Sequence, residues 1–257
     1  MEKVAVIGMG YVGIPVAAII ADSGINTIGL DIDEKKVESL KNGNYPIEGF
    51  EPGIKELIEK VVENGTLHST TDYNLARDSD VWIVCVQTPF DVEKMIPNFT
   101  ALRSSIKAIG SVMKRGCVVI VESTIPPGTM NGEVKEWLEE ESEMTAGLDF
   151  GLGHCPERVM PGKLIENLTS YGRALGGIGE NTHDVMENIY SRVTTGKLTR
   201  VDLETAEVVK TFENTYRDAE IAIANDFAKY CDAVGVDFFE VRELVNSVEA
   251  RNLHLPG

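Results

Sequence analysis

KVAVIGMGYVG, residues 3–13, joins a short apolar run to three glycines, Gly8, Gly10 and Gly13. The run is rich in Val and Ile, which predicts a buried strand. The residues that follow, 11–24, are mostly apolar and end in a glycine, which predicts a helix that stops there. A strand, a turn with G-x-G-x-x-G spacing and a helix form the first unit of a fold in which strands and helices alternate.

The alternation of strand and helix patterns continues through the first 200 residues. Apolar runs of strand length are separated by longer segments with charged faces and terminal glycines. This order predicts an α/β fold, a Rossmann-type doubly wound and mostly parallel sheet covered on both faces by helices. Further strands are predicted in 26–33, 81–89, 117–128, 149–162 (with a long loop after the strand) and 171–177, and further helices in 33–43, 51–65 and 180–193.

The pattern changes after residue 202. From Leu203 to about Val234 there is neither Pro nor Gly, which predicts one long helix. A shorter helix is predicted in 237–248. We therefore expect a first domain with the sheet over residues 1–200, and a second part over residues 201–257 that begins with the long central helix.

Each glycine of the turn has a chemical reason. Gly8 permits the tight turn, the missing side chain at Gly10 lets a pyrophosphate approach the backbone, and Gly13 lets the helix pack close to the sheet. The start of the helix offers free N–H groups and a partial positive charge to phosphates. Asp31, at the end of the next strand, can accept hydrogen bonds from ribose hydroxyls and repels a 2′-phosphate. The turn and Asp31 together predict NAD rather than NADP.

The composition argues against several classes of partner. The chain has 257 residues, 43% of them hydrophobic, and a formal net charge of −17, which disfavours binding to nucleic acid or to an anionic membrane. No stretch is long and apolar enough to span a bilayer, and the N-terminus has no signal-peptide pattern. The four cysteines form no CxxC pair and the four histidines are scattered, so we expect reduced thiols, no metal site and a cytoplasmic location.

Five segments carry a resemblance to a known family. In chain order they are GMGYVG, VQTP, STIPPGT, CPERVMPG and VVKTFENTYR. Together they resemble the N-terminal two-thirds of the nucleotide-sugar dehydrogenases, the family of UDP-glucose, GDP-mannose and UDP-N-acetylmannosamine dehydrogenases. The resemblance covers essentially the whole chain. It implies a two-step, NAD-dependent oxidation of the sugar C6 alcohol to a carboxylate, in which a cysteine holds the aldehyde as a thiohemiacetal and then as a thioester.

The resemblance also implies which residues meet the cofactor besides the three glycines. Tyr11 and Val12 would lie in the turn over the pyrophosphate, Asp31 and Lys36 would flank the adenosine ribose, and Thr88 and Thr124 would line the cofactor. Of these residues, Thr124 is expected closest to the reacting centre.

VVKTFENTYR places Lys210, Asn214 and Arg217 at i, i+4 and i+7, on one stripe of the long helix. The resemblance implies that Lys210 stabilises the developing alkoxide and oxyanions or shuttles their protons. Asn214 would hold an oxygen or a water in the same site, and Arg217 would contact the sugar or its diphosphate. The alternative is a solvated helix face with Glu213 and Asp218 as ion-pair partners.

The loop CPERVMPG would cover the substrate, with Glu157, Arg158 and Val159 closest to it, and Arg251 would lie nearby. UDP-glucose dehydrogenases tend to carry S-P-E-F-L-R-E-G here, whereas this chain has Pro161 in place of the second glutamate. The loop resembles above all that of UDP-N-acetylmannosamine dehydrogenase. UDP-N-acetylglucosamine and UDP-glucose 6-dehydrogenases remain the alternatives.

The family nucleophile is the cysteine of a Gly-Gly-His-Cys segment that follows a Pro-Gly pair. This chain ends at such a pair, Pro256 and Gly257, and none of its cysteines matches the motif, Cys155 in the substrate loop included. We therefore expect a truncated chain that binds NAD. It should not complete the four-electron oxidation, because no thiolate is present to trap the aldehyde.

The long helix is also a candidate oligomer interface. In the family it forms the core of a homodimer, and we expect the same here. Apolar side chains recur at helical spacing, an arrangement that could pack either within the chain or against a partner. They are Ile221, Ala224, Phe227, Ala228 and Cys231.

Two other functions stay open. β-Hydroxyacid dehydrogenases share the glycine turn and a K-x-x-x-N helix, but the segments CPERVMPG and STIPPGT argue against them. A non-catalytic NAD-binding module is the second alternative. Lys210 and Asn214 argue against it, because a sensor needs no pair of groups that stabilises an oxyanion.

Overall fold

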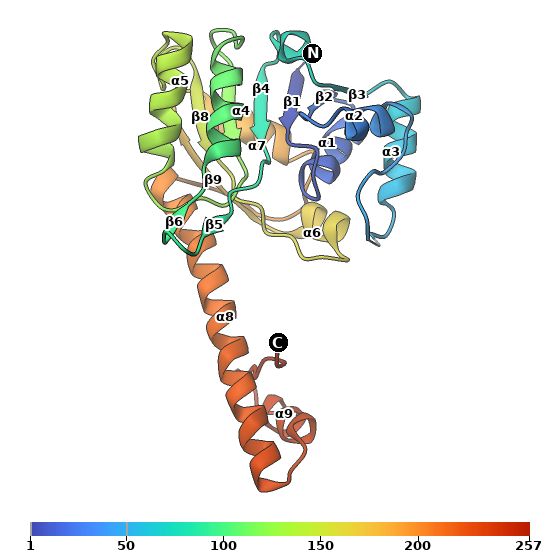
Figure 1. Ribbon diagram of the computed structural model, residues 1–257, viewed down its shortest axis with the longest axis vertical. Helices are drawn as coiled ribbons and strands as arrows, with labels where there is room; N and C mark the ends of the chain where they lie inside the picture. Colours follow the sequence, from blue (N-terminus) through green and yellow to red (C-terminus); the bar gives the residue numbers. More distant parts are fainter. Residues whose placement is uncertain (1, 50) are drawn as a thin grey trace. The chain divides into compact units, whose positions relative to one another are not determined.

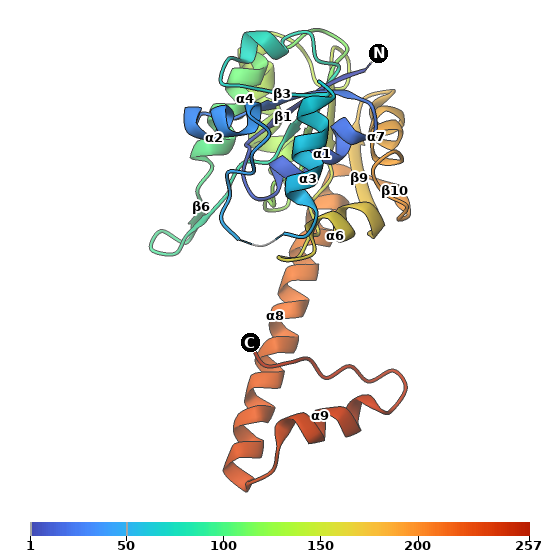
Figure 2. The ribbon, with the colours of Figure 1, turned by 90° about the vertical axis from the view of Figure 1, so that its right-hand side faces the viewer.

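The computed structural model describes residues 2–49 and 51–257. The chain forms two compact units, residues 1–210 and residues 211–257, and the boundary falls inside the long helix α8 (Leu203–Val234). Figures 1 and 2 show the sheet-containing unit with helices on both of its faces. The sheet unit contains the glycine turn.

One sheet of eight strands organises the first unit. Its order is β10-β9-β8-β7-β4-β1-β2-β3. Neighbouring strands of this described sheet are parallel except β8 and β9, which are antiparallel, so the prediction of a mostly parallel sheet is confirmed. The strands are β1 (Lys3–Ile7), β2 (Asn26–Leu30), β3 (Leu67–Thr70), β4 (Val81–Val84), β7 (Val118–Val121), β8 (Gly151–His154), β9 (Arg173–Ile178) and β10 (Leu198–Val201).

Apolar side chains on both faces of the sheet explain why helices cover it twice. Successive residues of a strand point to opposite faces. In β1, Val4 and Val6 enter one core cluster with α1, α3, α6 and α7, whereas Ala5 and Ile7 enter the other with α4 and α5. The helices are α1 (Gly13–Asp22), α2 (Glu34–Lys41), α3 (Ile54–Glu63), α4 (Thr100–Gly110), α5 (Lys135–Ser142), α6 (Leu164–Ser170), α7 (Thr182–Tyr190), α8 and α9 (Phe238–Asn246).

Several elements were absent from the sequence prediction, namely β3, α4, α6 and β10. In α4 the buried positions Leu102, Ile106 and Ile109 recur at i, i+4 and i+7. The sequence therefore contained the pattern of this helix, although the helix was not predicted. In β10 the side chains are exposed or half-buried, because it is an edge strand, and no apolar run marks it. The small elements η1 (Tyr73–Ala76), η2 (Met130–Val134) and the hairpin β5 (Phe90–Asp91) and β6 (Ile96–Pro97) complete this unit.

The second unit contains most of α8 and all of α9. The predicted long helix is confirmed, with the bounds Leu203–Val234. Ala224, Cys231 and Phe238 form a small buried cluster between the two helices, with Ala228 packed against it. The apolar residues that the sequence analysis placed at helical spacing fall into two groups. Ala224, Ala228 and Cys231 pack within the chain, whereas Phe227 is exposed. In the part of the chain that the structure describes, we find no helix with the length and hydropathy needed to cross a membrane.

Candidate active site at the carboxyl edge of the sheet

The glycine turn lies at the point where the strand order reverses. β1 is flanked by β2 on one side and β4 on the other, and ligands of doubly wound folds bind at such a point, beyond the carboxyl ends of the strands. Gly8 has φ +90°, and a Cβ there would lie 2.9 Å from the Cys85 carbonyl oxygen. A Cβ at Gly13 would lie 1.9 Å from the Gly8 carbonyl oxygen. A Cβ at Gly10 would meet nothing within 4 Å, so the backbone there faces open space that a pyrophosphate can enter.

The carboxylate of Asp31 follows the next strand, β2. Its Oδ2 lies 3.8 Å from the Lys36 Nζ, and its Oδ1 accepts a hydrogen bond from the Asp33 N–H at 2.9 Å. The structure thus brings together the two residues that the sequence placed beside the adenosine ribose. A fixed, mostly covered carboxylate at this position fits a ribose hydroxyl donor and disfavours a phosphate.

Thr88 and Thr124 follow the neighbouring strands β4 and β7. The Thr88 hydroxyl donates a hydrogen bond to the Thr124 carbonyl oxygen at 2.6 Å. In parallel, the Ser123 hydroxyl donates to the Val86 carbonyl oxygen at 2.6 Å. Two hydrogen bonds therefore join the loops after β4 and β7. The Thr124 side chain itself is exposed. The two threonines predicted to line the cofactor lie side by side.

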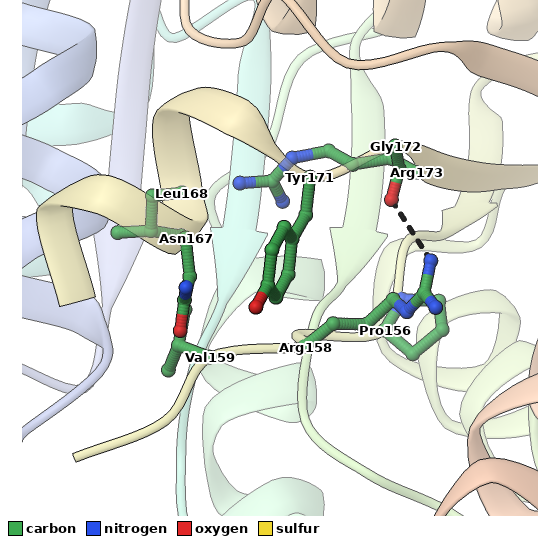
Figure 3. A pocket seen from close by; sticks show the side chains of 8 residues that line it. All are labelled: Pro156, Arg158, Val159, Asn167, Leu168, Tyr171, Gly172 and Arg173. Carbon is green, nitrogen blue, oxygen red and sulfur yellow. Dashed lines mark hydrogen bonds between the residues drawn. The ribbon is translucent and has the colours of Figure 1, made fainter. Parts of the chain in front are cut away.

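The loop CPERVMPG is held by hydrogen bonds within it and to residues outside it. The Glu157 N–H donates to the Glu122 carbonyl oxygen at 3.2 Å, and the Glu157 side chain accepts a hydrogen bond from the Val159 N–H. Arg158 donates to the Gly172 carbonyl oxygen at 3.1 Å, as Figure 3 shows. The adjoining crevice holds about 10 Å³, room for roughly one water. Direct roles of the three loop residues toward substrate stay predictions.

Lys210 is buried, with 7% of its surface exposed, although lysine usually lies in solvent. Three residues earlier on α8, Glu207 is fully buried and accepts hydrogen bonds from the N–H groups of Gly128 at 2.7 Å and Met130 at 2.8 Å. Burial raises the pKa of Glu207, against the two N–H donors. The start of α8 is thereby fixed to the segment that follows Thr124. A lysine withdrawn from solvent is inconsistent with a solvated helix face at this position.

Asn214 and Arg217 lie in the second unit. Arg217 donates to the Asn214 side-chain oxygen at 3.4 Å, and both side chains are half-buried. Their i, i+3 spacing on α8 explains the contact. Arg251 is exposed, and its backbone N–H donates to the Val248 carbonyl oxygen at 3.1 Å. The substrate roles of these three residues stay predictions.

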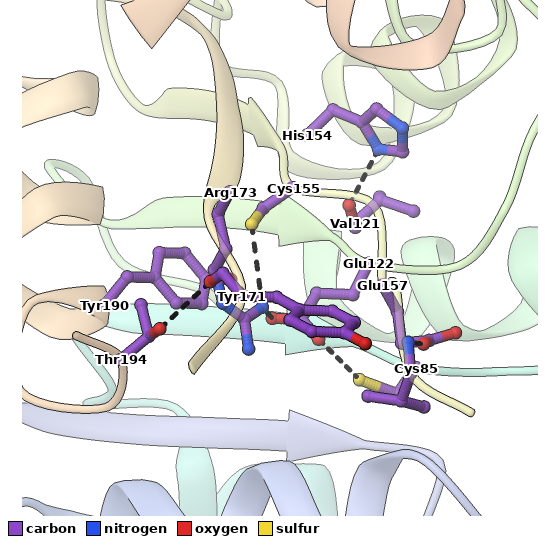
Figure 4. Close-up of polar contacts among 11 residues, drawn as sticks. Cys85, Val121, Glu122, His154, Cys155, Glu157, Tyr171, Arg173, Tyr190 and Thr194 are labelled. Carbon is purple, nitrogen blue, oxygen red and sulfur yellow. Dashed lines mark hydrogen bonds and ion pairs between the residues drawn. The ribbon is translucent and has the colours of Figure 1, made fainter. Parts of the chain in front are cut away.

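A buried polar network lies at the carboxyl edge, among residues that directly follow β4, β7 and β8 (Figure 4). Glu122, 1% exposed, accepts a hydrogen bond from the Tyr190 hydroxyl at 2.6 Å and pairs with Arg173 at 3.5 Å. The Arg173 guanidinium also lies 3.8 Å from the Cys155 Sγ and stacks over the Tyr190 ring at 4.8 Å. The Cys85 Sγ lies 3.9 Å from the second oxygen of Glu122. Burial raises the pKa of Glu122, and its partners Arg173 and Tyr190 oppose the shift.

The thiols of this network are poor nucleophiles. Burial raises the pKa of Cys155 to about 11, and burial together with the Glu122 charge raises the pKa of Cys85 well above its usual value. Both thiols are therefore protonated at neutral pH, and the thiolate is the reactive form. This supports the interpretation of Cys155 as a structural residue. All four cysteines are free; Cys117, Cys155 and Cys231 are buried, and Cys85 is partly exposed.

Four charged residues that hold this site were missed by the sequence analysis. Three of them carry a charge inside or next to an apolar run, which is an available signal, because a buried charge needs partners, whereas Glu51 stands beside Pro52 and Gly53 and carries no such signal. The sequence pattern does not say which partners these are. The four are Glu51, Glu122, Arg173 and Glu207.

Comparison with known proteins decides the family. The model of the UDP-glucose/GDP-mannose dehydrogenase family, NAD binding domain, matches residues 2–194, and the model of its central domain matches residues 204–257. The chain belongs to the UDP-glucose/GDP-mannose dehydrogenase family. The predicted resemblance and the Rossmann-type fold are confirmed. Because the first matched domain binds NAD, and because the open turn at Gly10 and the carboxylate of Asp31 fit it, NAD is the cofactor.

Relatives in the UDP-glucose/GDP-mannose dehydrogenase family are longer than this chain. It is 37% identical to UDP-N-acetyl-D-mannosamine dehydrogenase of Pyrococcus horikoshii over 255 residues, which is 99% of the chain and 60% of that relative. The structure of UDP-D-ManNAc dehydrogenase from Pyrococcus horikoshii superposes with a TM-score of 0.94, covering 100% of this chain and 60% of the other. A ternary complex of GDP-mannose dehydrogenase from Pseudomonas aeruginosa superposes with a TM-score of 0.91. It is 30% identical in sequence and covers 98% of this chain and 58% of the other. The chain thus spans about 60% of the length of the relatives it matches.

Proposed function

We propose that the protein containing this chain is an NAD-dependent nucleotide-sugar 6-dehydrogenase, which oxidises the C6 alcohol of a UDP-N-acetylhexosamine to the uronate. The observation that carries the proposal is Lys210, a buried cation on a helix whose start is fixed by Glu207 to the segment after Thr124. A cation held out of bulk water stabilises a developing alkoxide more strongly than a solvated one does. The similarity to UDP-N-acetyl-D-mannosamine dehydrogenases supports this substrate class.

The residues of this chain have separate tasks in the proposed reaction. NAD, when bound, supplies the hydride acceptor. The glycine turn and Asp31 orient the cofactor, and the loops that Thr88 and Thr124 join line the cofactor site. Lys210 stabilises negative charge on the sugar oxygen, and Asn214, one helical turn further along α8, binds an oxygen or a water.

UDP-N-acetylmannosamine is the preferred substrate in this proposal. The loop CPERVMPG carries Pro161 instead of a second glutamate, and the similar curated relatives from Pyrococcus horikoshii and Campylobacter jejuni are named UDP-N-acetyl-D-mannosamine dehydrogenases. UDP-N-acetylglucosamine and UDP-glucose are the alternative substrates. We place the protein in the cytoplasm, because its cysteines are free thiols and such thiols persist under reducing conditions.

The stoichiometry of cofactor reduction tests the proposed reaction. The full-length protein is incubated with NAD and a limiting amount of UDP-N-acetylmannosamine, UDP-N-acetylglucosamine, UDP-glucose or 3-hydroxyisobutyrate, and NADH is followed by absorbance. We expect two NADH for each UDP-N-acetylmannosamine, because conversion of an alcohol to a carboxylate removes four electrons. One NADH per hydroxyacid would instead identify a β-hydroxyacid dehydrogenase. Binding of NAD without turnover of any of the four would identify a non-catalytic module.

We further propose that α8 forms a homodimer interface. Large apolar side chains, each at least half exposed, follow one side of its second-unit part, since successive residues turn by about 100°. They are Phe212, Tyr216, Ile223, Phe227 and Tyr230. The adjacent side of the helix, turned by roughly 90° at 100° per residue, holds Ala224 and Cys231, which α9 already covers. An exposed apolar stripe of this length favours a second copy of the same helix as its partner.

A charge in this stripe tests the dimer. Phe227→Asp should weaken dimerisation about tenfold or more, because a carboxylate would be buried in an apolar interface. The matched control is Lys229→Asp on the same helix, where the side chain is exposed and lies off the stripe. Sedimentation equilibrium over a range of concentrations gives both dissociation constants. A monomeric wild-type protein, or equal weakening by the two variants, would contradict the proposed interface.

A further inference from the structure

One carboxylate, that of Glu51, joins the glycine turn to the substrate loop. We propose that Glu51 is a positioning residue that couples NAD binding at the glycine turn to the ordering of residues 155–164. That NAD binds at the glycine turn follows from the match to the NAD-binding domain and needs no assumption about the substrate. The description of residues 155–164 as the substrate loop rests on the proposed function.

The contacts of Glu51 come from two segments far from it in the chain. The Tyr11 hydroxyl, in the glycine turn, donates a hydrogen bond to the Glu51 Oε1. The same oxygen accepts a hydrogen bond from the Gly162 N–H at 2.6 Å, and the Oε2 accepts one from the Leu164 N–H at 3.3 Å. Glu51 is 7% exposed. The turn and the loop are both bonded to this one side chain, and the Gly162 N–H also lies close enough to the Tyr11 hydroxyl to affect its pKa.

The two backbone donors lie where the loop ends and α6 begins. Gly162 has φ +79°, a conformation that favours glycine and directs its N–H toward the carboxylate. Leu164 is the first residue of α6, so its N–H has no partner within the helix. Loss of the carboxylate would take this acceptor from both donors and would leave the Leu164 N–H unpaired, and a buried unpaired donor destabilises the local conformation. Glu51 therefore fixes the end of the loop that leads into α6.

The protonation states make the link strong at neutral pH. Burial would raise the pKa of Glu51, but the hydrogen bonds from Tyr11, Gly162 and Leu164 outweigh it and lower the pKa. Burial and the bond to Glu51 raise the pKa of Tyr11 to about 12. The carboxylate is thus charged and the phenol is a neutral donor. Hydrogen bonds to a charged acceptor are roughly twice as strong as neutral ones.

Coupling follows because Tyr11 stands between Gly10 and Val12, in the turn that the pyrophosphate approaches. A cofactor that fixes this turn also fixes the Tyr11 hydroxyl, and through Glu51 it restricts Gly162 and Leu164. Such a linkage is reciprocal: a loop in the bound arrangement must strengthen NAD binding by the same factor. The order in which sugar and cofactor bind would then be set by a residue that touches neither.

Tyr45 supplies a matched control. Its hydroxyl is buried and has no hydrogen-bond partner among the described residues. Burial, and next the nearby Glu51 charge, raise the pKa of Tyr45. Tyr11→Phe and Tyr45→Phe therefore each remove one phenol hydroxyl next to the same carboxylate. Only the first removes a bond in the proposed link.

Hydrogen exchange of the loop amides, with and without saturating NAD, tests the coupling. In the wild-type protein we expect NAD to slow exchange at Gly162 and Leu164 about fivefold or more, the lower range of typical coupling factors. In Tyr11→Phe the slowing should disappear, and the NAD dissociation constant measured by calorimetry should rise by the same factor. Glu51→Gln should also make both amides exchange faster without NAD. Tyr45→Phe and Glu48→Gln, a change at a nearby exposed glutamate, should behave as wild type.

The readouts separate coupling from a merely structural role. If Glu51 only stabilised the loop, Glu51→Gln would still speed hydrogen exchange of the loop amides, but Tyr11→Phe would leave the NAD affinity unchanged. That result would overturn the proposal. Equal NAD protection of the loop in wild type and Tyr11→Phe would overturn it as well. If Glu51→Gln fails to fold, Tyr11→Phe still decides the question. Because no sugar is used, failure of the proposed dehydrogenase function would leave these outcomes unaffected.

Discussion

Gly10→Ala should leave the protein folded and lower its affinity for NAD roughly 100-fold, equivalent to about 2.8 kcal/mol. A Cβ at this position meets nothing within 4 Å, and the backbone of Gly10 is not in the left-handed region, so alanine fits the free protein. The same methyl group would occupy the space through which the pyrophosphate approaches the backbone. Calorimetric titration with NAD measures the affinity, and thermal unfolding checks the fold.

Gly13→Ala is the opposite control within the same turn. Its Cβ would lie 1.9 Å from the Gly8 carbonyl oxygen, a backbone atom that cannot rotate away. Overpacking of this kind costs about 1–3 kcal/mol or more, so this variant should lose stability whether or not NAD is present. Normal NAD affinity in Gly10→Ala would show that the cofactor does not approach this turn. Equal losses of melting temperature in the two variants would contradict the open space at Gly10.

Arg173→Met should lower the free energy of unfolding by about 3–5 kcal/mol. Arg173 is 7% exposed and is the cation that faces Glu122, whose carboxylate is almost fully buried. Removal of the arginine leaves that charge without its partner in a region where water cannot replace it. Urea unfolding followed by tryptophan fluorescence suits the measurement, because Trp82 and Trp137 both belong to the first unit.

Arg200→Met is the matched control for the buried pair. Arg200 binds Asp184 at 2.7 Å and Glu187 at 2.6 Å, shorter distances than in the buried pair, but about half of its side chain is exposed. Exposed pairs contribute about 0–1 kcal/mol, so the loss should be small despite the better geometry. The double variant Arg173→Met with Glu122→Gln should regain part of the stability, since the unpaired charge is gone. Equal losses in the two single arginine variants would contradict a burial effect.

The sequence pattern was enough to predict most of the fold. Periodicity separated strands from helices, and the absence of Pro and Gly gave the limits of α8, because both effects are local. Elements without an apolar run were missed, as in the edge strand β10. The antiparallel pairing of β9 with β8 was not specified either, because pairing direction depends on the path of the chain between strands.

For the site, the sequence was enough to predict the residues that follow strand ends. It did not predict the buried residues whose hydrogen bonds fix the loops around them. Thr88 and Thr124 could be named from their motifs, but their mutual hydrogen bond links residues far apart in the chain. The same is true of Glu51 with Gly162 and of Glu207 with Gly128, which lie 111 and 79 residues apart. A single sequence carries the charge of each residue but not its distant partner. Such supporting contacts become visible only in three dimensions.

The buried free cysteines give the molecule built-in reporters of local opening. Cys117 and Cys155 lie in the first unit and Cys231 lies in the second, and all three are shielded from solvent. A thiol-alkylating reagent can modify them only when the surrounding structure opens transiently. The rate of alkylation at Cys231, compared with the rates at the other two, would therefore show whether the helical pair α8–α9 opens independently of the sheet, without any label being introduced.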